Sequence, residues 1–197
     1  MSEKEENKEN KKEEIIPPFI KGRNVDLVPQ SKNNIDQYAN WVNDEEVRRL
    51  SRNMVPVIKE DIKKWIEPSD VHPKETIYFE IYHKKEKRPI GNVGFNNINW
   101  VQRKGEIGLT IGDKNLWGKG LATEAVNLIL EYGFGELNLR KIKAGIFEPN
   151  IGSVKAAEKA GFKREAVLKN EIYIDGRHYS AFRYAIFKED WLKMHEK

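Results

Sequence analysis

Between residues 106 and 133, a strand, a turn with two glycines and a helix follow one another without a break. Apolar residues alternate over 107–111, which is typical of a strand, and recur at helical spacing over 121–132. Gly118 and Gly120 leave the turn without side chains where the first N–H groups of the helix lack intrahelical partners. Because free amides and the positive end of the helix dipole meet there, the stretch predicts a binding site for a phosphorylated ligand.

The spacing of these glycines excludes the two most familiar phosphate-binding motifs. For a P-loop, Gly112 and Gly118 stand one residue too far apart, and Gly120 replaces the Ser or Thr that holds magnesium. For the dinucleotide fingerprint, Thr123 stands where the third glycine is required. The predicted phosphate site therefore belongs to another class.

The turn resembles the acetyl-CoA pyrophosphate loop of the GNAT N-acetyltransferases, written Gln/Arg-x-x-Gly-x-Gly/Ala. Gly120 and Ala122 match its last two fixed positions, and Trp117 takes the Gln/Arg position. Residues 116–125, LWGKGLATEA, are similar to the RimJ/RimL-like branch of the family, where an aromatic residue is usual at that position. The resemblance implies an acetyl-CoA site made of Leu109, Ile111, Trp117, Gly118, Lys119, Gly120, Leu121, Ala122, Thr123, Asn150 and Ser153.

A second segment extends the resemblance to about residues 20–190. Asn150-x-x-Ser153 is followed by Glu-Lys-Ala-Gly-Phe at 158–162, where the family commonly has Asn-x-x-Ser/Ala and then Tyr-Glu-Lys-x-Gly-Phe. The implied fold is α/β (mixed α+β), a single GNAT-like domain with a mixed, mostly antiparallel sheet of about seven strands flanked by helices. Its fourth and fifth strands splay apart in a V, and the pantetheine arm of the cofactor lies in the gap.

The residue patterns predict the same order of elements. Strand patterns cover 24–28, 76–82, 89–95, 102–111, 141–147, 167–174 and 177–187, and the last two are joined by the hairpin signal Asp175-Gly176. Helical patterns cover 35–42, 59–67, 122–134, 151–160 and 188–195, with a further turn near 47–50. The order strand–helix–strand around 122–134 predicts a parallel crossover that sets the fourth and fifth strands side by side.

Composition narrows the class of protein. The 197 residues suit a single domain, here 17–197, after a disordered tail over 1–16 that is too rich in Lys, Glu and Asn to order itself. Cysteine is absent and the four scattered histidines have no ligand spacing, so neither disulfides nor a metal is expected. No apolar run approaches the roughly 20 residues of a membrane span, and no signal peptide is evident. The scattered basic residues do not favour nucleic acid, and a cytoplasmic protein is expected.

Moving an acetyl group from a thioester to an amine requires a base for the ammonium and a hydrogen-bond donor for the leaving thiolate. We predict that Glu106 is the base, because it shares a strand face with Gly108, which leaves room for an acceptor. Glutamates at this strand position often act as bases in the family that the chain resembles. The alternatives are a solvated carboxylate at the strand edge or a partner for Arg103 or Lys104, and Glu80 is the second candidate base.

Ser153 is the candidate donor to the thiolate. The resembled family often places a tyrosine acid one turn later, where this chain has Ala157. In RimJ/RimL-like enzymes the serine of Asn-x-x-Ser is proposed to assist the thiolate. The alternative is that Ser153 only completes a helix cap, with Asn150 as the capping residue rather than a ligand of the cofactor arm.

Three classes of function are compatible with these residues. The leading hypothesis is an acetyl-CoA-dependent N-acetyltransferase that acts directly on a primary amine, either a protein N-terminus or a small molecule. The alternative is a non-catalytic sensor that binds acetyl-CoA or CoA, and the third is an adaptor that uses its charged tail. The aromatic residues of the early helices are expected to pack in the core, and the alternative is that the loop 51–57 between these helices helps to wall an acceptor pocket. A substrate, solvent or the second subunit of a homodimer is expected to contact the hairpin residues Tyr173, Asp175, Arg177, His178 and Tyr179.

Overall fold

The computed structural model describes residues 17–67 and 73–196, so the tail predicted over residues 1–16 lies outside the described part, as does His72. The strands are β1 (Val25–Pro29), β2 (Ile77–His83), β3 (Arg88–Asn99), β4 (Lys104–Ile111), β5 (Lys141–Phe147), β6 (Lys163–Ile174) and β7 (Arg177–Phe187). The α-helices are α1 (Ile35–Asn43), α2 (Glu45–Ser51), α3 (Lys59–Ile66), α4 (Leu121–Gly135), α5 (Ile151–Lys159) and α6 (Lys188–His195). Two 3₁₀ turns, η1 (Lys32–Asn34) and η2 (Lys114–Leu116), precede α1 and α4.

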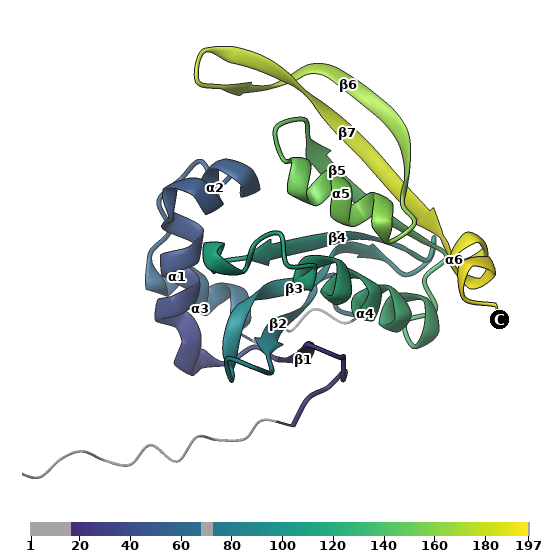
Figure 1. Ribbon diagram of the computed structural model, residues 1–197, viewed down its shortest axis with the longest axis horizontal. Helices are drawn as coiled ribbons and strands as arrows, with labels where there is room; N and C mark the ends of the chain where they lie inside the picture. The colour runs from purple at the N-terminus through teal and green to yellow at the C-terminus, as the bar shows by residue number, and fades with distance from the viewer. Residues whose placement is uncertain (1–16, 68–72, 197) are drawn as a thin grey trace, which may run out of the picture.

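The strands form one seven-stranded sheet in the order β1-β2-β3-β4-β5-β7-β6, flanked by helices (Figure 1). Neighbouring strands are antiparallel except β4 and β5, which are parallel and joined through α4. The predicted fold class, a mixed and mostly antiparallel seven-stranded sheet, is therefore confirmed. The predicted crossover from the fourth strand to the fifth is also present.

Each predicted strand and helix is present, and several ends are shifted. β3 runs on to Asn99 and β6 begins at Lys163, because pairing with β4 and β7 continues beyond the apolar alternation. β1 runs one residue beyond the expected end, to Pro29, which pairs with Phe79, and an edge strand tolerates proline there. The further turn near 47–50 is a helix of its own, α2, whose first N–H groups are capped by Asp44.

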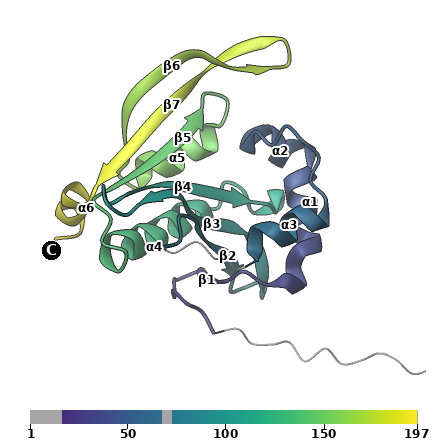
Figure 2. The same ribbon diagram turned by 180° about the vertical axis from the view of Figure 1, so that it is seen from behind.

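Helices cover both faces of the sheet. Tyr132 of α4 packs edge-on against Phe79 of β2, with ring centroids 5.6 Å apart. The next residue of β2, Glu80, contacts Tyr38 of α1. Since neighbouring residues of a strand point to opposite faces, α4 and α1 lie on opposite sides of the sheet. Figure 2 shows the same arrangement from behind, with α1, α2 and α3 gathered at one end and α6 at the other.

The main core lies between α4 and the sheet. Ile129, Leu130 and Phe134 of α4 are fully buried, as is Phe95 of β3. Full burial of such side chains contributes about 1.5–3 kcal/mol each, so this packing holds α4 firmly and sets its N-terminus beyond the end of β4. None of the described helices is both long and apolar enough to cross a membrane.

β4 and β5 pair along only part of their length. They pair at three consecutive positions, the last of which joins Glu106 to Lys143. Both strands then continue, β4 to Ile111 and β5 to Phe147, without pairing further with each other. A V-shaped gap therefore opens between them toward the turn before α4 and the start of α5.

Candidate functional site

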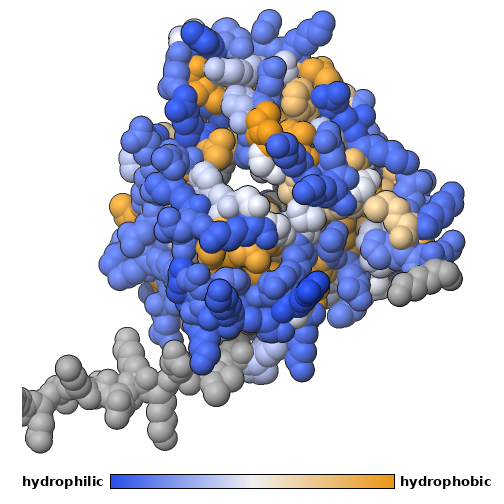
Figure 3. All heavy atoms as spheres, in the orientation of Figure 1, coloured by the Kyte–Doolittle hydropathy of each residue, from blue (hydrophilic) through white to orange (hydrophobic). Residues whose placement is uncertain are grey.

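A pocket of about 570 Å³ lies between α2, the end of β4, the turn before α4, and α5. Figure 3 shows the molecule hollowed between α2 and α5. Every residue that the sequence assigns to the acetyl-CoA site lines this pocket. The pocket also contains residues that the sequence did not single out, namely Val47, Leu50, Leu116, Pro149, Ile151, Gly152, Lys155, Ala156 and Lys159, together with Thr110. Ser51 lines it as well, from the segment expected to wall an acceptor pocket.

The turn before α4 requires glycine because of its backbone conformation. Gly118 and Gly120 have φ of 73° and 80°, in the left-handed region that side chains disfavour. A Cβ at either position would meet nothing within 4 Å, so crowding within the protein is not the reason. Gly120 is the N-cap of α4 and makes no side-chain cap. The first N–H groups of α4 therefore receive no side-chain cap from Gly120, and Leu121, Ala122 and Thr123 of this first turn line the pocket.

Trp117 closes the turn onto the strand that precedes it. Its indole Nε1 donates a hydrogen bond of 2.8 Å to the carbonyl oxygen of Ile111, the last residue of β4. This bond gives the aromatic residue a structural role at the position where the general family motif has Gln or Arg. It fixes the distance between the end of β4 and the start of α4.

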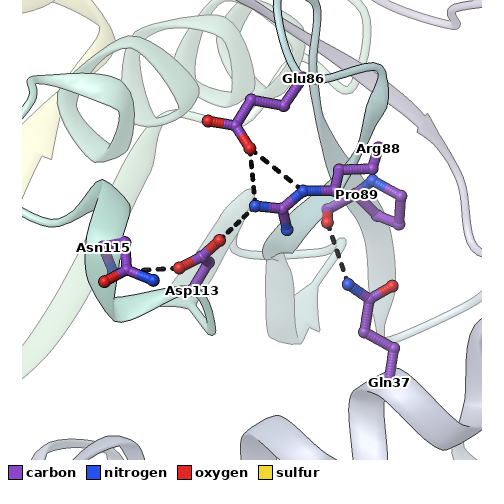
Figure 4. Close-up of polar contacts among 6 residues, drawn as sticks. All are labelled: Gln37, Glu86, Arg88, Pro89, Asp113 and Asn115. Carbon is purple, nitrogen blue, oxygen red and sulfur yellow. Dashed lines mark hydrogen bonds and ion pairs between the residues drawn. The ribbon is translucent and has the colours of Figure 1, made fainter.

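An ion-pair cluster holds the segment that leads into the turn (Figure 4). Arg88 of β3 contacts the carboxylate of Asp113 and also Glu86, at 2.8 Å. The hydrogen bond from Arg88 lowers the pKa of Asp113 below its ordinary value. Asp113 in turn accepts a hydrogen bond of 3.0 Å from the backbone N–H of Asn115 and so caps η2. Gln37 of α1 donates to the carbonyl oxygen of the neighbouring Pro89, which ties α1 to the same strand end.

Lys114 links the same segment to the opposite wall of the pocket. Its Nζ lies 2.9 Å from Asp44 and 3.5 Å from Glu46. Asp44 is the N-cap of α2 and accepts hydrogen bonds from the N–H groups of Glu46 and Val47. The contact therefore connects the turn before α4 with α2, so that two walls of the pocket are joined by one side chain.

Asn150 is engaged at both ends of its amide. Its Oδ1 accepts a hydrogen bond of 3.0 Å from the N–H of Ser153, which is the predicted cap of α5. Its Nδ2 donates to the carbonyl oxygen of Leu50 at 3.1 Å, a link to α2 that the sequence did not reveal. Ser153 is half-buried and lines the pocket, whereas Ala157 is buried and does not. The capping alternative is thus present, and any role of Asn150 and Ser153 toward a ligand stays a prediction.

Glu106 lies outside the pocket lining, where β4 and β5 part. Its side chain is 28% exposed, and its carboxylate lies 3.8 Å from Nη1 of Arg183 on β7. The alternative partner suggested by the sequence, Arg103, instead donates to the carbonyl oxygen of Asn138 at 2.7 Å. The ion pair with a residue far along the chain was not visible in the sequence, because it depends on the pairing of β5 with β7.

Tyr78 lies near Glu106 outside the pocket lining; sequence reasoning did not single it out, and its position corrects one expectation. Gly108 was expected to leave room for an acceptor, but a Cβ there would collide with the Tyr78 hydroxyl. A Cβ at Gly94 would collide with the same ring, so Tyr78 lies across both glycines. Its hydroxyl accepts a hydrogen bond of 2.7 Å from Nδ2 of Asn96. Burial raises the pKa of Tyr78, and the negative charge of Glu106 adds to the shift.

We call the sheet surface that carries Tyr78, Asn96, Glu106, Gly145 and Arg183 the polar face. Its residues come from β2, β3, β4, β5 and β7 and share one side because of the register of these strands. The signal available in the sequence is one glycine on each of three neighbouring strands, namely Gly94, Gly108 and Gly145. The strand pairing is needed to read it.

Glu80, the second candidate base, is enclosed by α1 and its preceding turn. It is 2% exposed and accepts hydrogen bonds from the N–H of Ser31 at 3.0 Å and from Nδ2 of Asn34 at 2.8 Å. The hydroxyl of Tyr38 is its third donor, and burial together with this carboxylate raises the pKa of Tyr38. With three donors inside the protein and no place in the pocket lining, Glu80 is suited to hold α1 on the sheet.

The tip of the β6–β7 hairpin contacts α2. Arg49 of α2 pairs with Asp175 at the tip, and Nη1 of Arg52 donates to the carbonyl oxygen of Tyr173 at 3.3 Å. Figure 1 shows the hairpin extending past α5 toward the α2 end of the molecule. Of the five hairpin residues named from the sequence, Asp175 and Tyr173 thus contact α2 and the residue that follows it. Across residues 17–67 and 73–196, no group of three His, Cys, Asp or Glu side chains is arranged to hold a metal ion.

The sequence matches the family model described as Acetyltransferase (GNAT) domain over residues 24–163. The uncharacterized N-acetyltransferase p20 of Bacillus licheniformis is 34% identical over 113 residues, which is 57% of this chain and 63% of that protein. The chain thus spans less than two thirds of that relative's length. The spermidine N(1)-acetyltransferase of Escherichia coli (strain K12) is 32% identical over 146 residues, 70% of this chain and 75% of that protein.

A solved structure has the same fold. Spermidine N-acetyltransferase from Vibrio cholerae, in complex with CoA and spermine, superposes with a TM-score of 0.77 at 24% sequence identity. The match covers 86% of this chain and 98% of that chain. At this identity the similarity concerns the fold alone.

Proposed function

The chain belongs to the acetyltransferase (GNAT) domain family, and from this premise we propose that it transfers an acetyl group from acetyl-CoA directly to a primary amine. The observation that carries the proposal is the pocket at the carboxyl end of β4, which gathers every residue assigned to the acetyl-CoA site. In the reaction the thioester C–S bond breaks and a C–N bond forms. The ammonium of the acceptor loses two of its three protons, one through the base to solvent and one to the leaving thiolate, so the products are the amide and the free thiol of CoA. The acceptor is a protein N-terminus or a small-molecule amine.

The residues of the pocket fit a ligand with a pyrophosphate and a long arm. The backbone amides from Gly118 to Thr123 suit the phosphates, and Lys119 adds a positive charge beside them. Leu109 and Ile111 offer an apolar edge of β4 to the arm. Bound there, acetyl-CoA supplies the activated acetyl group.

Glu106 is proposed as the base that takes a proton from the ammonium of the acceptor. Its half-buried carboxylate lies where β4 and β5 part, so that an amine at the mouth of this gap is within its reach, directly or through water. Tyr78 and Asn96 lie beside it on the polar face, where the neutral phenol offers a hydrogen-bond donor.

Ser153 is proposed to donate a hydrogen bond to the leaving sulfur. It lines the pocket on α5, one turn before the buried Ala157, which has no group to donate. Because its N–H is already held by Asn150, its hydroxyl is carried on a fixed backbone.

Finer assignments rest on the same residues. The string 116–125 favours the RimJ/RimL-like branch, and residues 17–197 are proposed as the acetyltransferase domain. The absence of a tyrosine at position 157 keeps the sensor as a second candidate function. A cytoplasmic location and a homodimer remain part of the proposal.

Two measurements with the full chain separate these functions. Acetyl-CoA is expected to raise the melting temperature, because a ligand that binds the folded state alone stabilises it by mass action. Release of free thiol is then expected with members of an amine panel. A thermal shift without thiol release on any amine would favour the sensor, and the absence of any shift would contradict both.

A further inference from the structure

The charges of the polar face are unevenly distributed where β4 and β5 part. Glu106 faces Lys143 across the last paired position, and the guanidinium of Arg183 lies 3.8 Å from its carboxylate. Further along β5, the guanidinium of Arg52 lies over the ring of Phe147 at 5.9 Å. The accessible carboxylate of Glu106 therefore has two basic residues as neighbours, Lys143 on β5 and Arg183 on β7.

Arg183 reaches Glu106 because β5 has a glycine between them. A Cβ at Gly145 would lie 2.8 Å from Nη1 of Arg183 and 3.3 Å from Oε1 of Glu106. The guanidinium therefore crosses the bare backbone of β5, and its side chain stays 52% exposed. The separation of 3.8 Å exceeds hydrogen-bond length, about 2.7–3.2 Å, so both groups keep donors and acceptors for a third molecule.

We infer that the acceptor is a zwitterionic amine, that is, a primary amine with a carboxylate on the neighbouring carbon, as in an α-amino acid. Arg183 binds the carboxylate and Glu106 faces the ammonium. This inference rests on the proposed acetyl transfer and names its substrate class. The planar fork of arginine matches a carboxylate through two parallel N–H···O bonds, which lysine does not reproduce. Bound this way, the amine lies at the point where the two strands part.

The same charges disfavour a polycationic acceptor. A second ammonium near Glu106 would meet Arg183 and Lys143, and like charges placed together oppose binding. The other carboxylate of this surface on β2, Glu80, already holds three donors of the α1 region. Polyamines and amines without a carboxylate therefore lack complementary partners here.

The test compares matched acceptors on matched variants of the full chain. Thiol release is measured with saturating acetyl-CoA for a panel of α-amino acids, for their primary amides, and for spermidine. The variants are Arg183→Gln, Arg183→Lys and, as control, Arg164→Gln. Arg164 lies over the ring of Phe182, on the face of β6 and β7 opposite the polar face.

The wild-type chain is expected to acetylate at least one amino acid with a kcat/KM about tenfold or more above that of its amide. Arg183→Gln should lower kcat/KM for the acid by about 10- to 100-fold, the range of a charge-assisted hydrogen-bond pair, and leave the amide nearly unchanged. The kcat/KM of Arg183→Lys for the acid should lie between those of the wild type and Arg183→Gln. The positive charge remains, but the planar bidentate geometry of the guanidinium is lost. Arg164→Gln should behave as wild type.

Three results in which thiol is still released would overturn the inference. These are equal activity on acids and amides, an equal loss on both in Arg183→Gln, and a preference for spermidine. An equal loss would mean that Arg183 only holds Glu106 in place. In each of these cases thiol release still occurs, so the proposed acetyl transfer stands while its substrate class fails. If acetyl-CoA binds and no α-amino acid is acetylated, the inference is also wrong.

Discussion

The turn before α4 and the polar face are built in contrasting ways. The turn is one continuous segment, fixed by two left-handed glycines, the bond from Trp117 to Ile111, and the burial of α4. The polar face takes its side chains from β2, β3, β4 and β7, beside the bare Gly145 of β5, and it exists only when the register of these strands is set. The ligand class of the turn can thus be inferred from its own residues. The polar face cannot be inferred in that way, because its side chains meet only through the register of distant strands.

Replacement of Glu106 by Gln gives the sharpest test of this contrast. A general base contributes about 10²–10⁴-fold to the rate, so kcat should fall by that range. The affinity for acetyl-CoA depends on the turn before α4 and should stay unchanged. The loss should shrink as the pH approaches the pKa of the acceptor amine, because free amine needs no base. Steady-state kinetics and calorimetric titration measure the two quantities.

The exposed Glu171→Gln on β6 serves as the matched control and should leave both values unchanged. If acetyl-CoA affinity falls together with kcat in Glu106→Gln, the two regions are not independent and Glu106 is a structural residue.

Replacement of Gly120 by Val tests the other side of the contrast. The new residue must adopt a φ of 80°, which β-branched side chains strongly disfavour, so the turn is expected to change conformation. Acetyl-CoA binding should weaken at least about tenfold, or 1.4 kcal/mol. Gly135→Val, at the far end of α4 where a Cβ meets nothing within 4 Å, should bind as wild type. Unchanged affinity in a folded Gly120→Val variant would falsify the role of this turn.

Replacement of Tyr78 by Phe removes one hydroxyl from the polar face. The ring keeps its place over the glycines, but the amide of Asn96 loses its acceptor. A net effect of about 0.5–1.5 kcal/mol for one hydrogen bond predicts a fall in kcat/KM for the amine of at most about tenfold. Acetyl-CoA affinity should not change. Tyr82→Phe, on the same strand, is the control, and an equal effect of both would deny Tyr78 a specific role.

Replacement of Asp113 by Asn is expected to have the smallest effect, on stability rather than catalysis. The hydrogen bond from Arg88 holds the pKa of Asp113 below its ordinary value, so its contribution is present above about pH 4 and is lost as the pH falls further. Asp113→Asn should lower the free energy of unfolding by about 1 kcal/mol at neutral pH and flatten part of its acid dependence. Urea unfolding from pH 7 to pH 3 measures both.

The control for this pair is Asp36→Asn, whose carboxylate is 71% exposed and pairs with Lys59. A decrease in stability equal to that of Asp113→Asn would show that the cluster around Arg88 contributes no more than a surface ion pair. The contact between Arg88 and Asp113 would then not stabilise the turn before α4 beyond the effect of a surface ion pair.

Sequence reasoning succeeded where the deciding interactions are short in range. Helical spacing located α4, and glycines located the turn whose left-handed conformation only they adopt readily. The cap of α5 by Asn150 lies three residues from its partner and was equally visible. The residues assigned to the acetyl-CoA site line one pocket for the same reason, since they come from two short segments and the end of one strand.

The sequence by itself determined the order of strands and helices, the turn before α4 and the family, because periodicity, backbone conformation and capping act within a few residues. The tertiary structure alone decided that Tyr78 lies over Gly108, that Arg183 crosses Gly145 to reach Glu106, and that Glu80 is enclosed by α1. These contacts join residues far apart along the chain. They follow from strand register, and a shift of one residue would send each side chain to the opposite face of the sheet.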